Sequence, residues 1–156
     1  MKKFIIFFFL LTACSKNDSN EFSALWTIKE VDADSNTLTV YLEIENNSNI
    51  QLNNGNWSLH WNQLGGAIIN SSLPNGIVSK RVNGEYYIMN FSSDYNISPG
   101  NKLELTFKLN GILNRIIYGP IGIFIHLNKE NTNYDVISKI DWKNAKGIEN
   151  LNLPNA

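Results

Sequence analysis

Short runs in which apolar residues alternate with other residues, separated by turn signals, dominate the chain from residue 25 onward. In the clearest run, Leu38, Val40, Leu42 and Ile44 occupy every second position. Because successive side chains of a strand point to opposite faces, this run predicts an extended strand with one buried face. No window keeps a helical spacing over three turns, so the pattern argues against a mainly helical fold.

The same alternation recurs near residues 57–62, 103–109 and 121–126, and residues 135–140 have the character of a last strand. In the run at 121–126, Ile121, Ile123 and Ile125 are expected on one face. Asn83-Gly84 lies between two apolar runs and is the strongest hairpin signal. About eight short strands at roughly ten-residue spacing predict an all-β fold: one antiparallel β-sandwich domain, immunoglobulin-like or carbohydrate-binding-module-like. A closed barrel is the alternative.

Composition excludes several classes of function. The 13 basic and 14 acidic residues give a net charge of −1, which becomes −3 if Lys2 and Lys3 leave with a leader. A nucleic-acid partner calls for a basic face, so none is expected. With 43% apolar and 12% aromatic residues the chain is not disordered. One cysteine excludes a disulfide framework. The 25 asparagines suit turns and hydrogen-bonding surfaces, unless they reflect codon usage alone.

The N-terminus has the pattern of a secretory leader. Met1-Lys2-Lys3 is basic, and residues 4–11 are an unbroken apolar run, too short to cross a bilayer as a helix. The boundary Leu11-Thr12-Ala13-Cys14 resembles the lipobox of bacterial lipoproteins. This resemblance implies cleavage before Cys14, acylation of Cys14 (palmitate among its acyl chains) and a place in the bacterial cell envelope. Ser15 favours the outer membrane, and a generic signal peptide with a stray cysteine is the alternative.

These features divide the chain into four parts. Residues 1–13 are the predicted signal peptide, and residues 14–24 are the lipidated cysteine and a flexible polar tether. Residues 25–142 form the β-sandwich domain. Residues 143–156 are a polar C-terminal tail.

A search for catalytic groups finds none that form a known constellation. The two histidines, His60 and His126, lie mid-strand, and the Gly-x-Ser-x-Gly motif of a nucleophile elbow is absent. The carboxylates are scattered, and no phosphate-binding glycine loop occurs. The sequence therefore predicts no catalytic residue, no metal ligand and no cofactor, and hence no enzyme.

One acidic segment partly mimics a calcium-binding loop. Asp32 and Asp34 precede Asn36, and Glu43 follows eleven residues after Asp32. The sixth position is Thr37 rather than the glycine that the sharp bend of such a loop needs. An Asx-rich hairpin turn is the favoured interpretation, with calcium as the alternative.

Three segments carry a resemblance to a known family. A strand closes in Asn46-Asn47-Ser48, a turn and tryptophan strand follow at residues 54–62, and the Asn83-Gly84 hairpin leads through Ser98-Pro99-Gly100 to residues 120–124. In this order they resemble the N-terminal domain of bacterial chitobiases and β-N-acetylhexosaminidases, a β-sandwich to which carbohydrate binding is ascribed. The resemblance covers roughly residues 25–127. It implies a stand-alone module, because the family's catalytic barrel needs about 200 residues or more.

Sugars offer apolar C–H faces and a rim of hydroxyls, which proteins bind with aromatic rings, amides and carboxylates. Trp57 and Trp61 share one side of their strand, about 13 Å apart. They either stack on sugars or, in the favoured interpretation, pack in the core around Leu59. The candidate carbohydrate-binding residues are Tyr86, Tyr95, Trp61, Trp57, Asn62 and His60.

The remaining expectations concern faces of strands. Ser58, His60 and Asn62 lie opposite the tryptophans and form a solvent-facing or hydrogen-bonding face. Of the adjacent tyrosines, Tyr86 is expected outside and Tyr87 inside, because Tyr87 lies with the more apolar set of side chains.

The sequence as a whole predicts a lipid-anchored, non-catalytic carbohydrate-binding module for β-linked N-acetylglucosamine-type glycans. Its expected partners are the glycan and the membrane, reached through the lipid on Cys14. The alternative is a structural or docking module, or a truncated remnant, of a β-N-acetylhexosaminidase without its barrel, with a hydrolase as partner.

Overall fold

The computed structural model describes residues 21–111, 119–141 and 145–147. Within these residues the fold is all-β, as predicted, with one short 3₁₀ turn, η1. No helix among them is long and apolar enough to cross a membrane. The elements are β1 (Phe22–Asp32), β2 (Thr37–Asn46), β3 (Trp57–Asn62), β4 (Ala67–Ile68), η1 (Asn70–Ser72), β5 (Ile77–Asn83), β6 (Tyr86–Phe91), β7 (Lys102–Asn110), β8 (Ile121–Leu127) and β9 (Thr132–Asp141).

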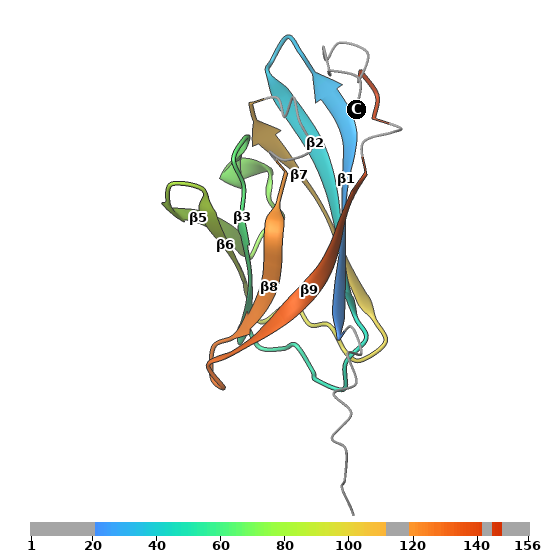
Figure 1. Ribbon diagram of the computed structural model, residues 1–156, viewed down its shortest axis with the longest axis vertical. Helices are drawn as coiled ribbons and strands as arrows, with labels where there is room; N and C mark the ends of the chain where they lie inside the picture. Colours follow the sequence, from blue (N-terminus) through green and yellow to red (C-terminus); the bar gives the residue numbers. More distant parts are fainter. Residues whose placement is uncertain (1–20, 112–118, 142–144, 148–156) are drawn as a thin grey trace, which may run out of the picture.

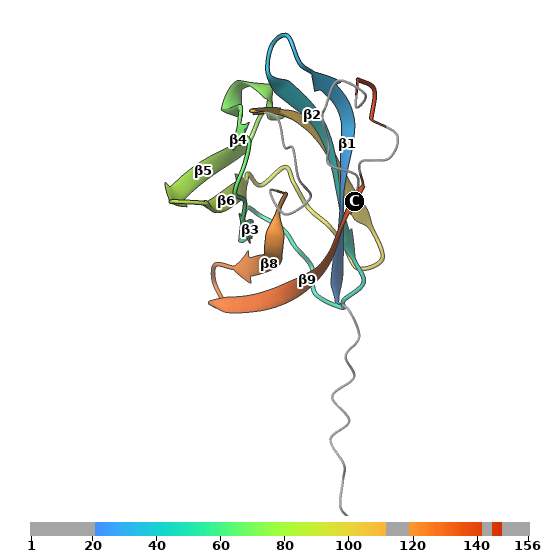
Figure 2. The ribbon, with the colours of Figure 1, turned by 45° about the horizontal axis from the view of Figure 1, so that its top comes forward.

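The strands form one sheet that folds back on itself in the order β4-β7-β2-β1-β9-β8-β3-β6-β5. Figures 1 and 2 show two layers, one of β1, β2 and β7 and the other of β8, β3, β6 and β5, with β9 crossing between them. The first part of β9 pairs with β8 and the second part pairs with β1. The sandwich prediction is confirmed, with one difference: β1 and β9 are parallel, whereas the other paired strands are antiparallel.

The core lies between the two layers and consists of the apolar residues at alternate positions of the strands. The predicted inward set of β2, from Leu38 to Ile44, is fully buried. Aromatic rings from both layers meet at the centre: Trp26 of β1 lies 6.0 Å from Trp61 of β3 and 5.4 Å from Phe107 of β7, between ring centroids. Burying three such large rings supplies much of the hydrophobic stabilisation.

The turn η1 connects edge strand β5 with β7, the neighbour of the two-residue edge strand β4. The Asn70 side-chain oxygen accepts a hydrogen bond from the Ser79 amide of β5, at 2.9 Å. On the other side, the Ser72 hydroxyl accepts one from the Lys108 amide of β7, at 2.7 Å. Unpaired amides on an exposed strand invite pairing with another chain, so these two side chains protect one amide of edge strand β5 and one amide of β7 just beyond its pairing with β4.

A bulge in β8 interrupts the predicted alternation, so the expected position of Ile121 is wrong. Ile123 and Ile125 are buried, but Ile121 is 49% exposed. The pairing with β3 shifts between Phe124 and Ile121, and Gly122 has a φ of 60°. The extra residue turns Ile121 to the outer side, and glycine adopts this left-handed conformation without strain.

Two domain boundaries need correction. Phe22 and Ala24, assigned to the tether from sequence, are buried residues of β1. Near the other end, Ala145 is buried, and the Lys146 amide and carbonyl bond to β1 at Lys29 and Val31. The predicted leader, Cys14, Trp142 and the end of the tail lie outside the described residues.

The abundant asparagines have structural roles in the described residues. Asn36, Asn54 and Asn131 adopt left-handed backbone conformations, with φ between 49° and 53°. Asn46 is fully buried, and its amide nitrogen donates to the Ile50 and Ile97 carbonyls while its oxygen accepts from the amide and hydroxyl of Ser48. Asparagine suits both tasks because it tolerates positive φ and has donors and an acceptor on one short side chain.

Candidate functional site

The outer surface of β5, β6, β3, β8 and β9 gathers aromatic, imidazole and amide side chains, and is here called the β3 face. Strand pairing arranges these side chains in three rows across the strands. Directly paired residues project on the same side of a sheet, so each row is a line of neighbours. The rows are Val78, Asn90, Ser58, His126 and Asn133; Lys80, Ile88, His60, Phe124 and Asp135; and Asn83, Tyr86, Asn62 and Ile121.

His60 lies at the centre of the β3 face and contacts its neighbours on three strands. Its ring stacks on Phe124, with centroids 4.7 Å apart, and lies 5.6 Å from the ring of His126. Its Nε2 is 2.7 Å from the Ser58 hydroxyl and its Nδ1 is 2.5 Å from the Tyr86 hydroxyl. A neutral imidazole has one donor and one acceptor nitrogen, so one hydroxyl donates to the ring and the other accepts from it.

The protonation state of His60 follows from this packing. Burial has the larger effect and the nearby His126 the smaller one, and together they lower the pKa of His60 from 6.5 to about 4. Burial also raises the pKa of the Tyr86 hydroxyl. At neutral pH both groups are therefore uncharged, and the centre of the β3 face is a neutral network of hydrogen bonds and rings.

The Ser58–His60 pair has the distance of a catalytic dyad, which the sequence reasoning did not anticipate. Residues two apart on a strand share a face, and this alone brings the hydroxyl to the imidazole. Ser58 is only 2% exposed, so a substrate carbonyl has no access to its oxygen. His60 is a weak base at its lowered pKa, and its second partner is a phenol rather than a carboxylate. The pair therefore has the chemistry of a structural hydrogen bond.

Both predicted tryptophans, Trp57 and Trp61, are fully buried, so they do not form a sugar platform. Trp57 stacks on Phe91 with centroids 3.8 Å apart, and its indole nitrogen donates to the Tyr95 carbonyl. The indole nitrogen of Trp61 donates to the side chain of Gln63. Their place is the core, as the favoured interpretation held.

The other predicted residues divide between two regions. Tyr86, His60 and Asn62 come together on the β3 face, whereas Tyr95 lies in the loop after β6, where its hydroxyl donates to the Asn75 carbonyl. Of the adjacent tyrosines, Tyr87 is buried and Tyr86 is partly exposed, which confirms that expectation. Of the two expectations for the face of Ser58, His60 and Asn62, the hydrogen-bonding one holds for Ser58 and His60, which are buried and bonded to each other.

Sequence reasoning missed Ile88 of β6 and the contribution of β8 to this face. Phe124, His126 and Ile88 are half-buried beside His60. The alternation of apolar residues in β6 and β8 indicates that these side chains point away from the core. Only the pairing of β3 with both β6 and β8 shows that they meet. His126 is held in turn by Asn133 of β9, whose oxygen lies 2.7 Å from its Nδ1.

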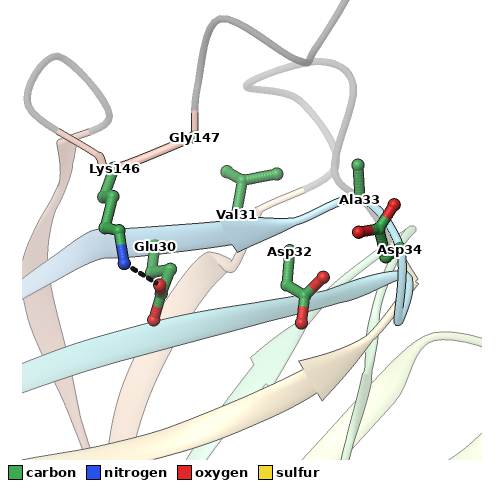
Figure 3. A pocket seen from close by; sticks show the side chains of 7 residues that line it. All are labelled: Glu30, Val31, Asp32, Ala33, Asp34, Lys146 and Gly147. Carbon is green, nitrogen blue, oxygen red and sulfur yellow. Dashed lines mark hydrogen bonds and ion pairs between the residues drawn. The ribbon is translucent and has the colours of Figure 1, made fainter.

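A separate hollow of about 400 Å³ lies at the β1–β2 hairpin (Figure 3). Its side chains include Glu30, Asp32 and Asp34, and Lys146 forms an ion pair with Glu30 at 3.0 Å. Hydrogen bonds from the side chain and then the amide of Ser35 lower the pKa of Asp32. The bond from the Ser35 amide to the Asp32 carboxylate confirms the predicted Asx-type hairpin turn. In the part of the chain that the structure describes, no three His, Cys, Asp or Glu side chains gather as metal ligands would.

The opposite layer presents a polar face. Lys102 of β7 bridges Glu43 and Glu104, at 2.9 and 2.7 Å, and the Tyr41 hydroxyl donates to Glu43. Burial and the two carboxylates raise the pKa of Tyr41 to about 12. One ammonium group faces two carboxylates in this cluster, which therefore keeps a net negative charge.

The chain matches no protein-family model and no curated protein sequence. Its fold is similar to part of a GH20 exo-β-N-acetylglucosaminidase from Vibrio harveyi in complex with N-acetylglucosamine, with a TM-score of 0.65 and 13% identity over 81% of this chain. This chain spans 19% of the length of that enzyme. The likeness agrees with the hexosaminidase resemblance in the sequence, at the level of the fold.

Two smaller structures share the fold over nearly their whole length. The chitin-binding domain of Chi18aC from Streptomyces coelicolor has a TM-score of 0.50 and 12% identity, over 70% of this chain and 94% of that domain. A biomass-sensing module of an RsgI-like protein from Clostridium thermocellum, which resembles a family 3 carbohydrate-binding module, has a TM-score of 0.50 and 10% identity, over 75% and 97%. At these identities the similarities establish an all-β fold of the carbohydrate-binding-module kind.

Proposed function

We propose that this protein is a non-catalytic carbohydrate-binding module that holds a glycan on its β3 face. The observation that carries the proposal is the neutral cluster of His60, Tyr86 and Phe124, with ring and hydroxyl contacts already ordered. A glycan gains from such a surface because its rings offer apolar C–H groups and its hydroxyls need fixed donors and acceptors. Little side-chain entropy remains to be lost on binding, since the network is formed in the free protein.

The proposed ligand is a β-linked glycan of the N-acetylglucosamine type. An acetamido group combines an amide with a methyl group, and the β3 face pairs the exposed amide of Asn62 with the exposed aliphatic chain of Ile121 on the neighbouring strand. Two proteins of similar fold support this choice by their names, an exo-β-N-acetylglucosaminidase and a chitin-binding domain.

The test is retention of the full chain on insoluble chitin, with cellulose beside it. Tyr86→Ala and Phe124→Ala should each weaken retention on chitin about tenfold, because each removes a ring of the cluster. Tyr41→Ala is the matched control on the opposite layer and should bind like the native protein. A folded protein that is not retained on any polysaccharide would contradict the proposal.

A docking role towards a protein, such as a hydrolase, is the second candidate. It is favoured by Val78 and Ile121, which are 60% and 49% exposed on the β3 face. A folded protein without affinity for polysaccharides would favour this candidate.

We further propose that the domain is anchored to the bacterial outer membrane through lipid on Cys14. The support is the Leu11-Thr12-Ala13-Cys14 sequence and the basic and apolar segments before it. Cys14→Ser should remove the acylation site and shift the protein from the membrane fraction to the soluble fraction, or leave it unprocessed. Unchanged fractionation of this variant would contradict the anchor.

A further inference from the structure

The middle row of the β3 face runs across five strands. Lys80 of β5 pairs with Ile88 of β6, Ile88 with His60 of β3, His60 with Phe124 of β8, and Phe124 with Asp135 of β9. With neighbouring strands about 4.8 Å apart, the row is about 19 Å long. It is here called the central row.

The central row is apolar in the middle and charged at its ends. Ile88 and Phe124 are half-buried, and His60 lies buried between them. Lys80 and Asp135 are exposed at the two ends. An ammonium group only donates hydrogen bonds and a carboxylate only accepts them, so the two ends differ in what they offer to a hydroxyl.

We propose that the β3 face binds an extended glycan laid across the strands along the central row, with about one sugar unit over each strand. This inference rests on the proposed function and adds the direction and length of the ligand. The length of a pyranose unit in a β-linked chain is close to the spacing of strands. Outward side chains along a single strand are about 6.8 Å apart, which is too far for one unit each. The spacing of outward side chains therefore matches the length of the sugar units across the strands, and does not match it along a strand.

The rows on either side of the central row complete the site. The Tyr86 hydroxyl and the Asn62 amide lie along one side, and Asn90 and His126 lie along the other. These side chains reach hydroxyl and acetamido groups at the edges of the middle units. The end units contact Lys80 and Asp135 and are bound last as the chain lengthens.

The experiment is calorimetric titration of the full chain with chitin oligosaccharides of two to six units. Affinity should rise with each added unit up to about five and then level off. Lys80→Ala and Asp135→Asn should each weaken the five-unit ligand about five- to tenfold, the effect of one hydrogen bond. Both should leave the two-unit ligand unchanged. Lys108→Ala on the opposite layer and Asp34→Asn in the β1–β2 turn are the matched controls, without effect at any length.

Three outcomes would overturn the inference. Affinity that levels off at two units means that the ligand does not follow the central row. End variants that weaken short and long ligands equally mean that Lys80 and Asp135 do not contact separate units. If Asn62→Ala and Asn90→Ala weaken the affinity for long oligosaccharides only, the ligand runs along the strands. If no oligosaccharide of any length binds the folded protein, the proposed function fails as well.

Discussion

The side-chain oxygen of Asn70 accepts a hydrogen bond from the amide of Ser79 at 2.9 Å, and so links the single 3₁₀ turn of the described residues to edge strand β5. Two residues later, Ser72 does the same for the Lys108 amide of β7. A three-residue turn thus bonds to edge strand β5 and to β7, which the edge strand β4 pairs with only at Leu109 and Asn110. The arrangement lets the fold remain unclosed without leaving these two amides available to another chain.

Replacing Asn70 tests this edge protection. Asn70→Ala should lower the free energy of unfolding by about 1 kcal/mol, because the Ser79 amide loses its partner at a half-buried site. It should also speed hydrogen exchange of that amide. Urea unfolding and exchange measured by NMR would check both effects. Asn49→Ala, at an exposed position, is the control, and equal stability of the two variants would contradict the role of Asn70.

The buried amide of Asn46 should be far more sensitive. Asn46→Ala would remove two donors and an acceptor that serve Ile50, Ile97 and Ser48 in a site without solvent. The expected loss is about 3 kcal/mol or more, measured by urea unfolding. Asn47→Ala, at the exposed neighbouring position, should cost less than about 0.5 kcal/mol.

The lowered pKa of His60 predicts a pH dependence of stability. Between pH 6.5 and about 4 the unfolded chain takes up a proton on this residue while the folded protein does not. Stability should therefore fall as the pH drops through this window, by no more than about 3 kcal/mol. Urea unfolding at several pH values would show it. His60→Gln should flatten this part of the profile, and a slope identical to that of the native protein would contradict the assignment.

The bulge at Gly122 predicts a selective effect of substitution. Its φ of 60° strains a residue with a side chain, although there is open space for a Cβ atom. Gly122→Val should lower stability by about 1–2 kcal/mol, and Gly122→Asn should cost less because asparagine tolerates the left-handed conformation. Thermal unfolding compares the two. Equal losses would mean that backbone strain is not the cause.

The core position of Trp57 separates stability from binding. Trp57→Phe keeps a ring against Phe91 but removes the donor to the Tyr95 carbonyl, so stability should fall by about 1–3 kcal/mol. Retention on chitin should be unchanged at a temperature where the variant is folded. Loss of retention on chitin by a fully folded variant would mean that Trp57 belongs to the binding surface.

The fold was predictable because alternation reports which side chains of each strand are buried. Leu38 to Ile44, the Asn83-Gly84 hairpin and the last strand all follow from local pattern. The parallel pairing of β1 with β9 does not, because it joins residues more than a hundred positions apart. Ile121 was misplaced for a related reason: a glycine bulge shifts the alternation by one, and its effect depends on the partner strand.

The candidate site was predictable only in part. The alternation of β3 places His60 and Asn62 opposite the core tryptophans, and that of β6 turns Tyr86 outward. The cluster itself depends on three strands meeting in one register, which sets Phe124 beside His60 and His126 near both. Burial of Ser58 and His60 has the same origin, since the covering side chains come from other strands.

The place of β1 in the sheet has a mechanical consequence. This first strand lies between β2 and β9 and is hydrogen-bonded to both, antiparallel on one side and parallel on the other. A force that pulls on the chain at Glu21, along the strand, must shear two ladders at once instead of peeling one strand away. The domain should therefore resist extension from its N-terminal end far better than it would if its first strand were at an edge.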